Sequence, residues 1–162
     1  LNPSTTFKTV FGLFKISWSP KGITSLKLLG ENISFFKAQK PIPSEIRDAI
    51  QATQKHLTGE LQDLSVFPLD FFGTGSFFTK VYQHTRKIPC GTTLTYCKLA
   101  KEAGSPKAAR AVGQAMARNP FLLFVPCHRI ISTSKKLGGF SAPGGVNTKR
   151  ALLQLEGNTD CY

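Results

Sequence analysis

The chain has 162 residues, 41% of them hydrophobic and 19% charged, which is typical of a globular protein and excludes the disordered, collagen-like and disulfide-rich classes. Its longest apolar stretch, around Pro120 to Pro126, is too short to cross a bilayer, and the N-terminus shows no secretory signal, so we expect an intracellular protein with reduced cysteines. Twenty-one Lys and Arg against nine Asp and Glu give a net charge of +12, which favours an anionic polymer as partner.

The positive charge is concentrated in the second half of the chain. Residues 81–162 hold twelve basic and three acidic side chains, and no acidic residue occurs from Ala103 to Leu155. Such a basic face is either a solvated surface or a nucleic-acid interface, and charge alone does not decide between the two.

The N-terminal part of the chain predicts a small sheet with one helix. Alternating apolar and polar residues from Gly12 to Ser19 predict a half-buried strand, and Ile23 to Leu29 predicts the strand that returns beside it. Ser44 is predicted to cap a helix that ends at Gly59 and packs on this sheet. The aperiodic stretch that follows contains Pro and Gly and predicts a boundary between two domains, residues 1–72 and 73–162.

The second domain is predicted to be mostly helical. Ser76 is predicted to cap its first helix, and a second helix is predicted from Thr95 to Gly104. Ser105-Pro106 and Asn119-Pro120 bracket a third helix, Lys107 to Arg118, joined to the second by a very short turn. This order is that of a helix-turn-helix, whose Ala- and Gly-rich second helix could approach a nucleic-acid groove closely, although plain helical packing has the same pattern.

A cysteine beside a histidine and an arginine follows these helices. Phe121 to Val125 is predicted as a buried strand that leads into Cys127, His128 and Arg129. The basic neighbours favour the thiolate, which is the reactive form of cysteine, whereas an inert buried cysteine is the alternative. The Gly-rich segment from Leu137 to Gly145 lacks the GxxxxGK[ST] pattern of a phosphate-binding loop. A last helix is predicted to start near Asn147.

The string VPCHRI at 125–130 resembles the active-site signature of the O6-alkylguanine-DNA alkyltransferases, the methylated-DNA-protein-cysteine methyltransferases. Other elements of that family's pattern stand around it in order and with similar spacing: IPCGTTLTYCKLA (88–100), KAARAVGQAM (107–116), RNP (118–120), GGFSAPGG (138–145) and KRALLQLEG (149–157). The resemblance implies a ribonuclease-H-like α/β domain with a small antiparallel sheet and a helix, followed by a mostly α-helical domain with a helix-turn-helix.

The resemblance implies that Cys127 takes an alkyl group from guanine O6 in DNA, and from thymine O4, by in-line displacement. The product is an S-alkylcysteine that is not reversed, so one protein repairs one lesion. By the same resemblance His128 draws the thiol proton through a water, and Glu156 orients His128. Arg129 is implied to be structural, and Asn119 to be a hinge before the active-site segment.

The resemblance also implies how DNA is held. The recognition helix enters the minor groove, the damaged nucleotide is flipped out of the duplex, and the Arg110 side chain takes its place in the stack. The residues expected to contact DNA are Arg110, Tyr96, Lys107, Ala109, Met116 and Lys149, with Lys149 at a phosphate. The residues expected to line the pocket for the flipped base are Tyr96, Val125, Pro126, Phe140 and Ser141.

The expected partner is double-stranded DNA that contains O6-alkylguanine, bound by a monomer, with no membrane and no cofactor. No metal site is expected, because residues 1–75 contain no cysteine and only one histidine, His56. The protein is expected in the cytoplasm of a prokaryote or the nucleus of a eukaryote. Two alternatives are a lesion-binding protein without chemistry, which the acceptor Cys127 disfavours, and a helix-turn-helix regulator, for which the PCHR string would be a coincidence.

Overall fold

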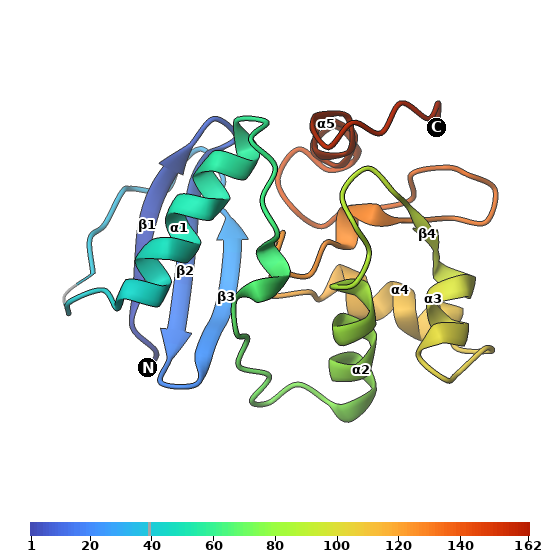
Figure 1. Cartoon of the computed structure of the whole chain (residues 1–162), viewed down its shortest axis with the longest axis horizontal. Coiled ribbons are helices and arrows are strands. Elements are labelled where there is room, and N and C mark those ends of the chain that lie inside the picture. Colours follow the sequence, from blue (N-terminus) through green and yellow to red (C-terminus); the bar gives the residue numbers. More distant parts are fainter. Residues whose placement is uncertain (39) are drawn as a thin grey trace. The chain divides into compact units, whose positions relative to one another are not determined.

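The computed structural model describes residues 1–38 and 40–162, whose contacts divide the chain into two compact units (Figure 1). The first unit comprises Leu1–Phe72 with Pro120–Phe124, and the second comprises Gly73–Asn119 with Val125–Tyr162. The predicted domain 73–162 was therefore wrong to include Pro120–Phe124. Backbone hydrogen bonds tie that segment to the first unit, because Leu26 N donates to Pro120 O at 2.8 Å and Leu122 N donates to Leu26 O at 3.1 Å.

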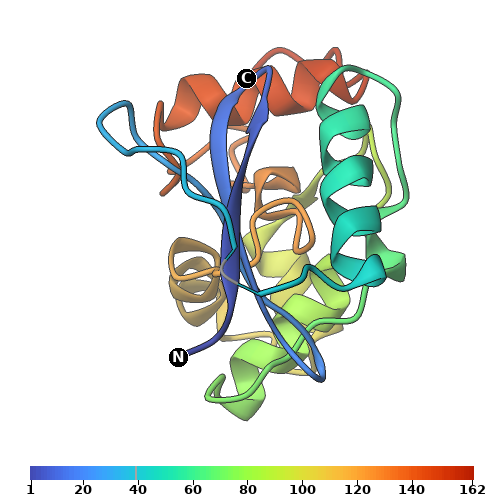
Figure 2. The same cartoon turned by 90° about the vertical axis from the view of Figure 1, so that its left-hand side faces the viewer.

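The first unit is an antiparallel sheet with one long helix. Its elements are β1 (Ser4–Thr9), β2 (Gly12–Ser19), β3 (Gly22–Leu28), α1 (Ser44–Leu57) and the 3-10 turn η1 (Leu64–Val66). The sheet has the order β1-β2-β3, and α1 packs along it (Figure 1, Figure 2). The strand predicted from Gly12 to Ser19 is confirmed, with Phe14, Ile16 and Trp18 buried.

Strand β1 was not predicted, because two of its buried side chains are threonines. Thr5 and Thr6 are buried, and their hydroxyl oxygens accept hydrogen bonds from Ala38 N at 3.2 Å and Phe36 N at 2.9 Å. These bonds compensate the burial of two polar groups. A pattern that counts apolar residues does not detect a strand whose inward face is partly polar.

The second unit is mostly helical and places its helices around one short parallel ladder. Its elements are α2 (Ser76–Thr85), β4 (Leu94–Thr95), α3 (Tyr96–Glu102), α4 (Ala109–Ala117), the 3-10 turn η2 (Cys127–Arg129), β5 (Ile130–Ile131) and α5 (Val146–Leu155). Strand β4 pairs with β5 in parallel, which brings the start of α3 beside the segment that follows Cys127. An α/β first unit and a mostly helical second one are therefore confirmed.

Three predicted helix starts were wrong. Ser44 and Ser76 are the first helical residues rather than caps, because the backbone of the preceding Pro43 and Gly75 accepts the first bonds of α1 and α2. The third helix begins at Ala109 instead of Lys107, since Ser105 to Ala108 close a separate turn through Ala108 N and Ser105 O at 2.9 Å. The connection between α3 and α4 is consequently longer than the very short turn that we expected.

The apolar run from Phe121 to Val125 is buried but is not a strand. One parallel bridge joins Phe121 to Leu26, and the chain then turns sharply with Leu123 at φ 70°. The rings of Phe121 and Phe124 pack edge to face against Phe71 and Phe67, with centroids 5.3 and 5.8 Å apart. Aromatic packing, rather than a ladder of backbone bonds, buries this segment.

In the part of the chain that the structure describes, no helix is both long enough and apolar enough to span a bilayer.

Candidate active site

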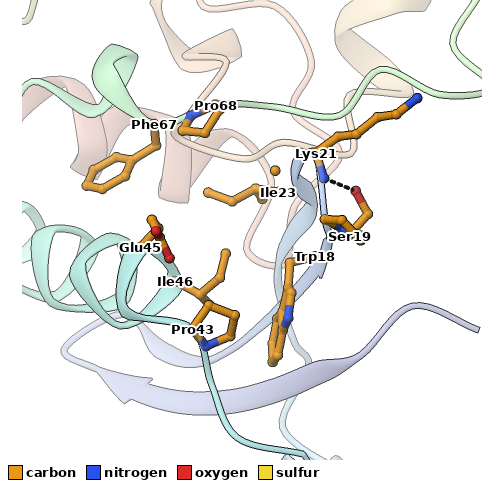
Figure 3. A pocket seen from close by; sticks show the side chains of 11 residues that line it. Trp18, Ser19, Lys21, Ile23, Pro43, Glu45, Ile46, Phe67 and Pro68 are labelled. Atoms are coloured by element: carbon orange, nitrogen blue, oxygen red, sulfur yellow. Dashed lines mark hydrogen bonds between the residues drawn. The ribbon is translucent and has the colours of Figure 1, made fainter.

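Each unit contains a hollow of similar size, and the two hollows differ in the reactive groups that line them. The hollow of the first unit, about 320 Å³, lies between the β2–β3 turn, the start of α1 and Phe67-Pro68 (Figure 3). Its walls are mainly apolar, and its charged groups are Lys21 and Glu45. The hollow of the second unit, about 330 Å³, has Cys127, which bears a thiol, in its wall. The candidate active site therefore lies in the second unit.

Cys127 is held at the start of a tight turn. It is the first residue of η2, is 6% exposed, and its backbone N donates to Val125 O at 2.7 Å. The Asn119 side chain donates from Nδ2 to the same Val125 carbonyl at 2.9 Å. This turn places the thiol against the cavity while the two residues that follow it point into the protein.

A buried histidine and a buried glutamate form the next part of the site. His128 is fully buried, and its Nε2 lies 2.8 Å from Oε1 of Glu156. Glu156 ends α5, where it is 4% exposed. A carboxylate at one ring nitrogen fixes the orientation of the imidazole and stabilises its protonated form. The structure thus brings Glu156 to His128 from 28 residues away, as the resemblance implied.

Arg129 binds the same carboxylate from a second direction. Its Nε donates to Oε2 of Glu156 at 2.9 Å, and its Nη2 donates to Oε1 at 2.7 Å. This planar two-point contact is the strongest geometry for a guanidinium and a carboxylate. Arg129 also donates from Nη1 to the backbone oxygen of Ile88. The arginine therefore joins η2, the end of α5 and the segment before β4.

The environment of Cys127 has opposing effects on its ionisation. Burial raises the pKa of the thiol, while a hydrogen bond from the Asn119 side chain and the positive charge of Lys149 lower it. Because burial is the largest effect, the thiol keeps its proton more firmly than an exposed cysteine does. A group that removes the proton is consequently needed before the sulfur can attack.

Lys149 does not lie where a phosphate contact would require. Its side chain is 0% exposed, and Nζ donates to Ile130 O at 2.6 Å, to Leu137 O, and to Gly139 O at 3.4 Å. Desolvation lowers its pKa to about 8. The prediction of a DNA-binding Lys149 was therefore wrong. A helical spacing of three and four residues from the buried Leu152 and Leu153 was the signal that could have placed it on the inner face of α5.

The structure places three of the residues predicted for the pocket, Tyr96, Phe140 and Ser141, in the wall of this cavity. The residues that line it are Tyr96, Gly113, Met116, Ala117, Cys127, Gly139, Phe140 and Ser141. Val125 and Pro126 were wrongly placed in the wall: both are buried, the oxygen of Val125 accepts from Cys127 N, and that of Pro126 accepts from Arg129 N. Sequence reasoning missed Gly113 and Ala117, although their spacing from Met116 puts all three on one face of α4.

Tyr96 and the Gly-rich segment approach each other, and both contribute to the wall of this cavity. A Cβ atom on Gly138, whose φ is 73°, would lie 3.4 Å from the Tyr96 hydroxyl. Burial raises the pKa of Tyr96, so its hydroxyl stays protonated and can donate a hydrogen bond at neutral pH. Phe140 is half-buried and Ser141 exposed, so an aromatic residue and a hydroxyl residue belong to the wall of the cavity.

The remaining predicted DNA contacts lie on and just before α4 with differing exposure. Lys107 and Arg110 are exposed, and Ala109 is half-buried. Met116, which we expected at DNA, is instead buried and lines the cavity. The Tyr82 hydroxyl of α2 donates to Ala115 O at 2.8 Å and thus holds α4 from its inner side. The exposed side of α4 and the residues just before it therefore carry the cationic groups of Arg110 and Lys107.

Comparison with known proteins places this site in context. Residues 76–158 match the family model described as 6-O-methylguanine DNA methyltransferase, DNA binding domain. The chain is 39% identical over 135 residues to the methylated-DNA–protein-cysteine methyltransferase of Mycobacterium tuberculosis H37Rv, covering 83% of this chain and 79% of that protein. It is 37% identical to the constitutive enzyme of that name from Bacillus subtilis 168, covering 96% of each. The crystal structure of M. tuberculosis OGT in complex with DNA is similar at a TM-score of 0.74 and 33% identity, over 95% of this chain and 92% of that one.

Proposed function

Since the chain belongs to the O6-methylguanine-DNA methyltransferase family, we propose that it repairs DNA by moving a methyl or larger alkyl group from guanine O6 to the sulfur of its own Cys127. One observation carries the proposal: a buried thiol lines a cavity, and the next residue is a buried histidine bound to a carboxylate. A thiol in this position can react with a small group only after the group has entered the cavity.

The reaction begins with removal of the Cys127 proton. His128 takes it through a water, and the Glu156 carboxylate stabilises the imidazolium that forms. The positive charge of Lys149 favours the thiolate that remains. The sulfur then attacks the alkyl carbon, an S–C bond forms, the C–O bond breaks, and its electron pair stays on guanine O6. The guanine takes up a proton, and the thioether keeps the alkyl group.

Access to guanine O6 requires the base to leave the duplex. We propose that α3 and α4 act as a helix-turn-helix whose α4 enters the minor groove, because the exposed face of α4 combines small side chains with Arg110. The Arg110 guanidinium would then occupy the space of the flipped nucleotide. Tyr96, Phe140 and Ser141 would hold the base in the cavity, with thymine O4 as a second substrate.

A lesion-binding protein without chemistry is the competing function. It would use the same cavity and the same basic face, but it has no need for the His128–Glu156 pair beside a thiol. Within the family, the DNA complex of the M. tuberculosis protein supports DNA as the partner of this chain as well. We propose that the monomer is the reacting species, since all the groups of the site come from one chain.

The test is a single-turnover reaction with duplex DNA that carries O6-methylguanine, followed by the intact mass of the protein. One methyl group should be added per protein, and repair should stop when the protein is used up. Cys127→Ser should bind the DNA and gain no methyl group, while the matched Cys161→Ser, at an exposed thiol, should react normally. Many turnovers per protein, or normal transfer by Cys127→Ser, would contradict the proposal.

A further inference from the structure

A short segment before β4, residues 88–91, contacts the Arg129–Glu156 pair at several points. Ile88 O accepts from Arg129 Nη1, and the Cys90 sulfur accepts from Arg129 Nη2 at 3.1 Å. Gly91 lies against the backbone of Glu156, so closely that a Cβ atom there would be 3.1 Å from Glu156 O. Residues 88–91 thus contact both Arg129 and Glu156, and they are not among the residues that line the cavity.

The hydrogen bond to Cys90 matters because of what else Arg129 Nη2 does. The same nitrogen donates to Glu156 Oε1, and that oxygen also lies 2.8 Å from His128 Nε2. The histidine and the arginine therefore share one carboxylate oxygen. Any rotation of the guanidinium changes how much of the negative charge on Oε1 faces the imidazole.

The other side of the segment is anchored too. Asn158 Nδ2 donates to Gly91 O at 3.1 Å, and Asn158 Oδ1 accepts from the Tyr162 hydroxyl at 3.0 Å. The Tyr162 ring packs against buried Ile131 and Leu137. The segment is thus held between the end of α5 and the guanidinium, which makes the Cys90 sulfur a fixed acceptor rather than a mobile one.

We propose that Cys90 is a positioning residue for alkyl transfer: its sulfur fixes the Arg129 guanidinium so that Glu156 presents Oε1 to His128. The inference rests on the proposed function, because it needs a reaction in which His128 takes the Cys127 proton. Without the Cys90 acceptor, Glu156 supports the imidazole less well, and the buried thiol loses its proton only at higher pH.

The test compares Cys90→Ala, which removes the acceptor, with Cys90→Ser, which keeps one. Single-turnover transfer from an O6-methylguanine oligonucleotide is measured from about pH 6 to pH 9. We expect Cys90→Ala to be roughly three- to tenfold slower at neutral pH and to approach the wild-type rate as the pH rises. Cys90→Ser should stay within about twofold of wild type throughout. Cys97→Ala, at an exposed thiol on α3, is the matched control and should not change the profile.

The pH profiles of the Cys90 variants decide whether Cys90 positions Arg129. A Cys90→Ala profile that overlays the wild type, or an equal loss at every pH that Cys90→Ser does not rescue, overturns the positioning role. If Cys90→Ala does not fold, Cys90→Val fills the volume without offering an acceptor and replaces it in the same comparison. Wild-type protein that gains no methyl group would instead reject the proposed function and leave this geometry unchanged.

Discussion

Replacing Lys149 by Met should change how the stability of the protein depends on pH. Desolvation lowers the Lys149 pKa from 10.5 to about 8 in the folded protein, and unfolding restores the ordinary value. Below about pH 8 the group is charged in both states, and the folded state bears the cost of burying the charge. Between these two pKa values only the unfolded chain binds the proton, so stability rises with pH.

The size of the stability change follows from the pH interval between the folded and the unfolded pKa of Lys149. Each pH unit inside it adds about 1.4 kcal/mol, so the Lys149 contribution to the free energy of unfolding should grow by about 2 kcal/mol between about pH 8 and pH 9.5. Lys149→Met has no proton to lose and lacks this contribution. It also leaves the carbonyls of Ile130 and Leu137 without a donor, at about 1–3 kcal/mol each. Because the neutral amine of the wild type also donates, that loss is present both below and above about pH 8.

The assay is urea unfolding followed by far-ultraviolet circular dichroism, because most helices belong to the second unit. Both proteins should carry Cys127→Ser, because burial raises the pKa of the Cys127 thiol. The folded protein therefore loses stability as the pH rises from the ordinary pKa of a thiol to the raised one, and this would overlap the effect of Lys149. Burial also raises the pKa of Tyr82, to about 12, but that effect is present in both proteins. If the free energies of unfolding of the two proteins, plotted against pH, stay parallel from about pH 7 to pH 9.5, Lys149 is not a buried charge with a lowered pKa.

Three other changes test the remaining parts of the site. Arg110→Ala should slow repair of duplex O6-methylguanine by about ten- to a thousandfold and leave the reaction of the free O6-alkylguanine base nearly normal. If the ratio of the two rate constants is the same as in the wild type, Arg110 has no role in base flipping. Glu156→Gln should slow both substrates and lower the free energy of unfolding by about 3–5 kcal/mol, since the buried Arg129 loses its carboxylate; a stability equal to wild type in urea unfolding would contradict this. Binding of undamaged duplex should weaken steeply with salt, and Lys107→Ala should reduce the log–log slope by about one while Lys149→Met leaves it unchanged, which salt titrations can check.

Local patterns were sufficient for the elements whose burial repeats along the chain. Strand β2 alternates strictly, so its inward face could be predicted from residue order alone. The helix predicted to begin at Thr95 is confirmed as α3, and the Thr95 hydroxyl caps it by accepting from Lys98 N at 3.2 Å. Strand β1 and the buried turn at Phe121 could not be predicted in the same way, because buried threonines and aromatic contacts between distant residues determine them.

Residue order is enough to predict Cys127 as the acceptor with His128 beside it, because the two residues are adjacent and belong to one motif. The groups that surround these two residues depend on how distant parts of the chain pack. The packing of α5 brings Glu156 to His128 and buries Lys149, and the segment before β4 brings Cys90 to Arg129. The physical reason is that a residue's type and spacing report which chemistry it can perform, whereas its charge state and hydrogen-bond partners depend on how much water the folded chain excludes around it.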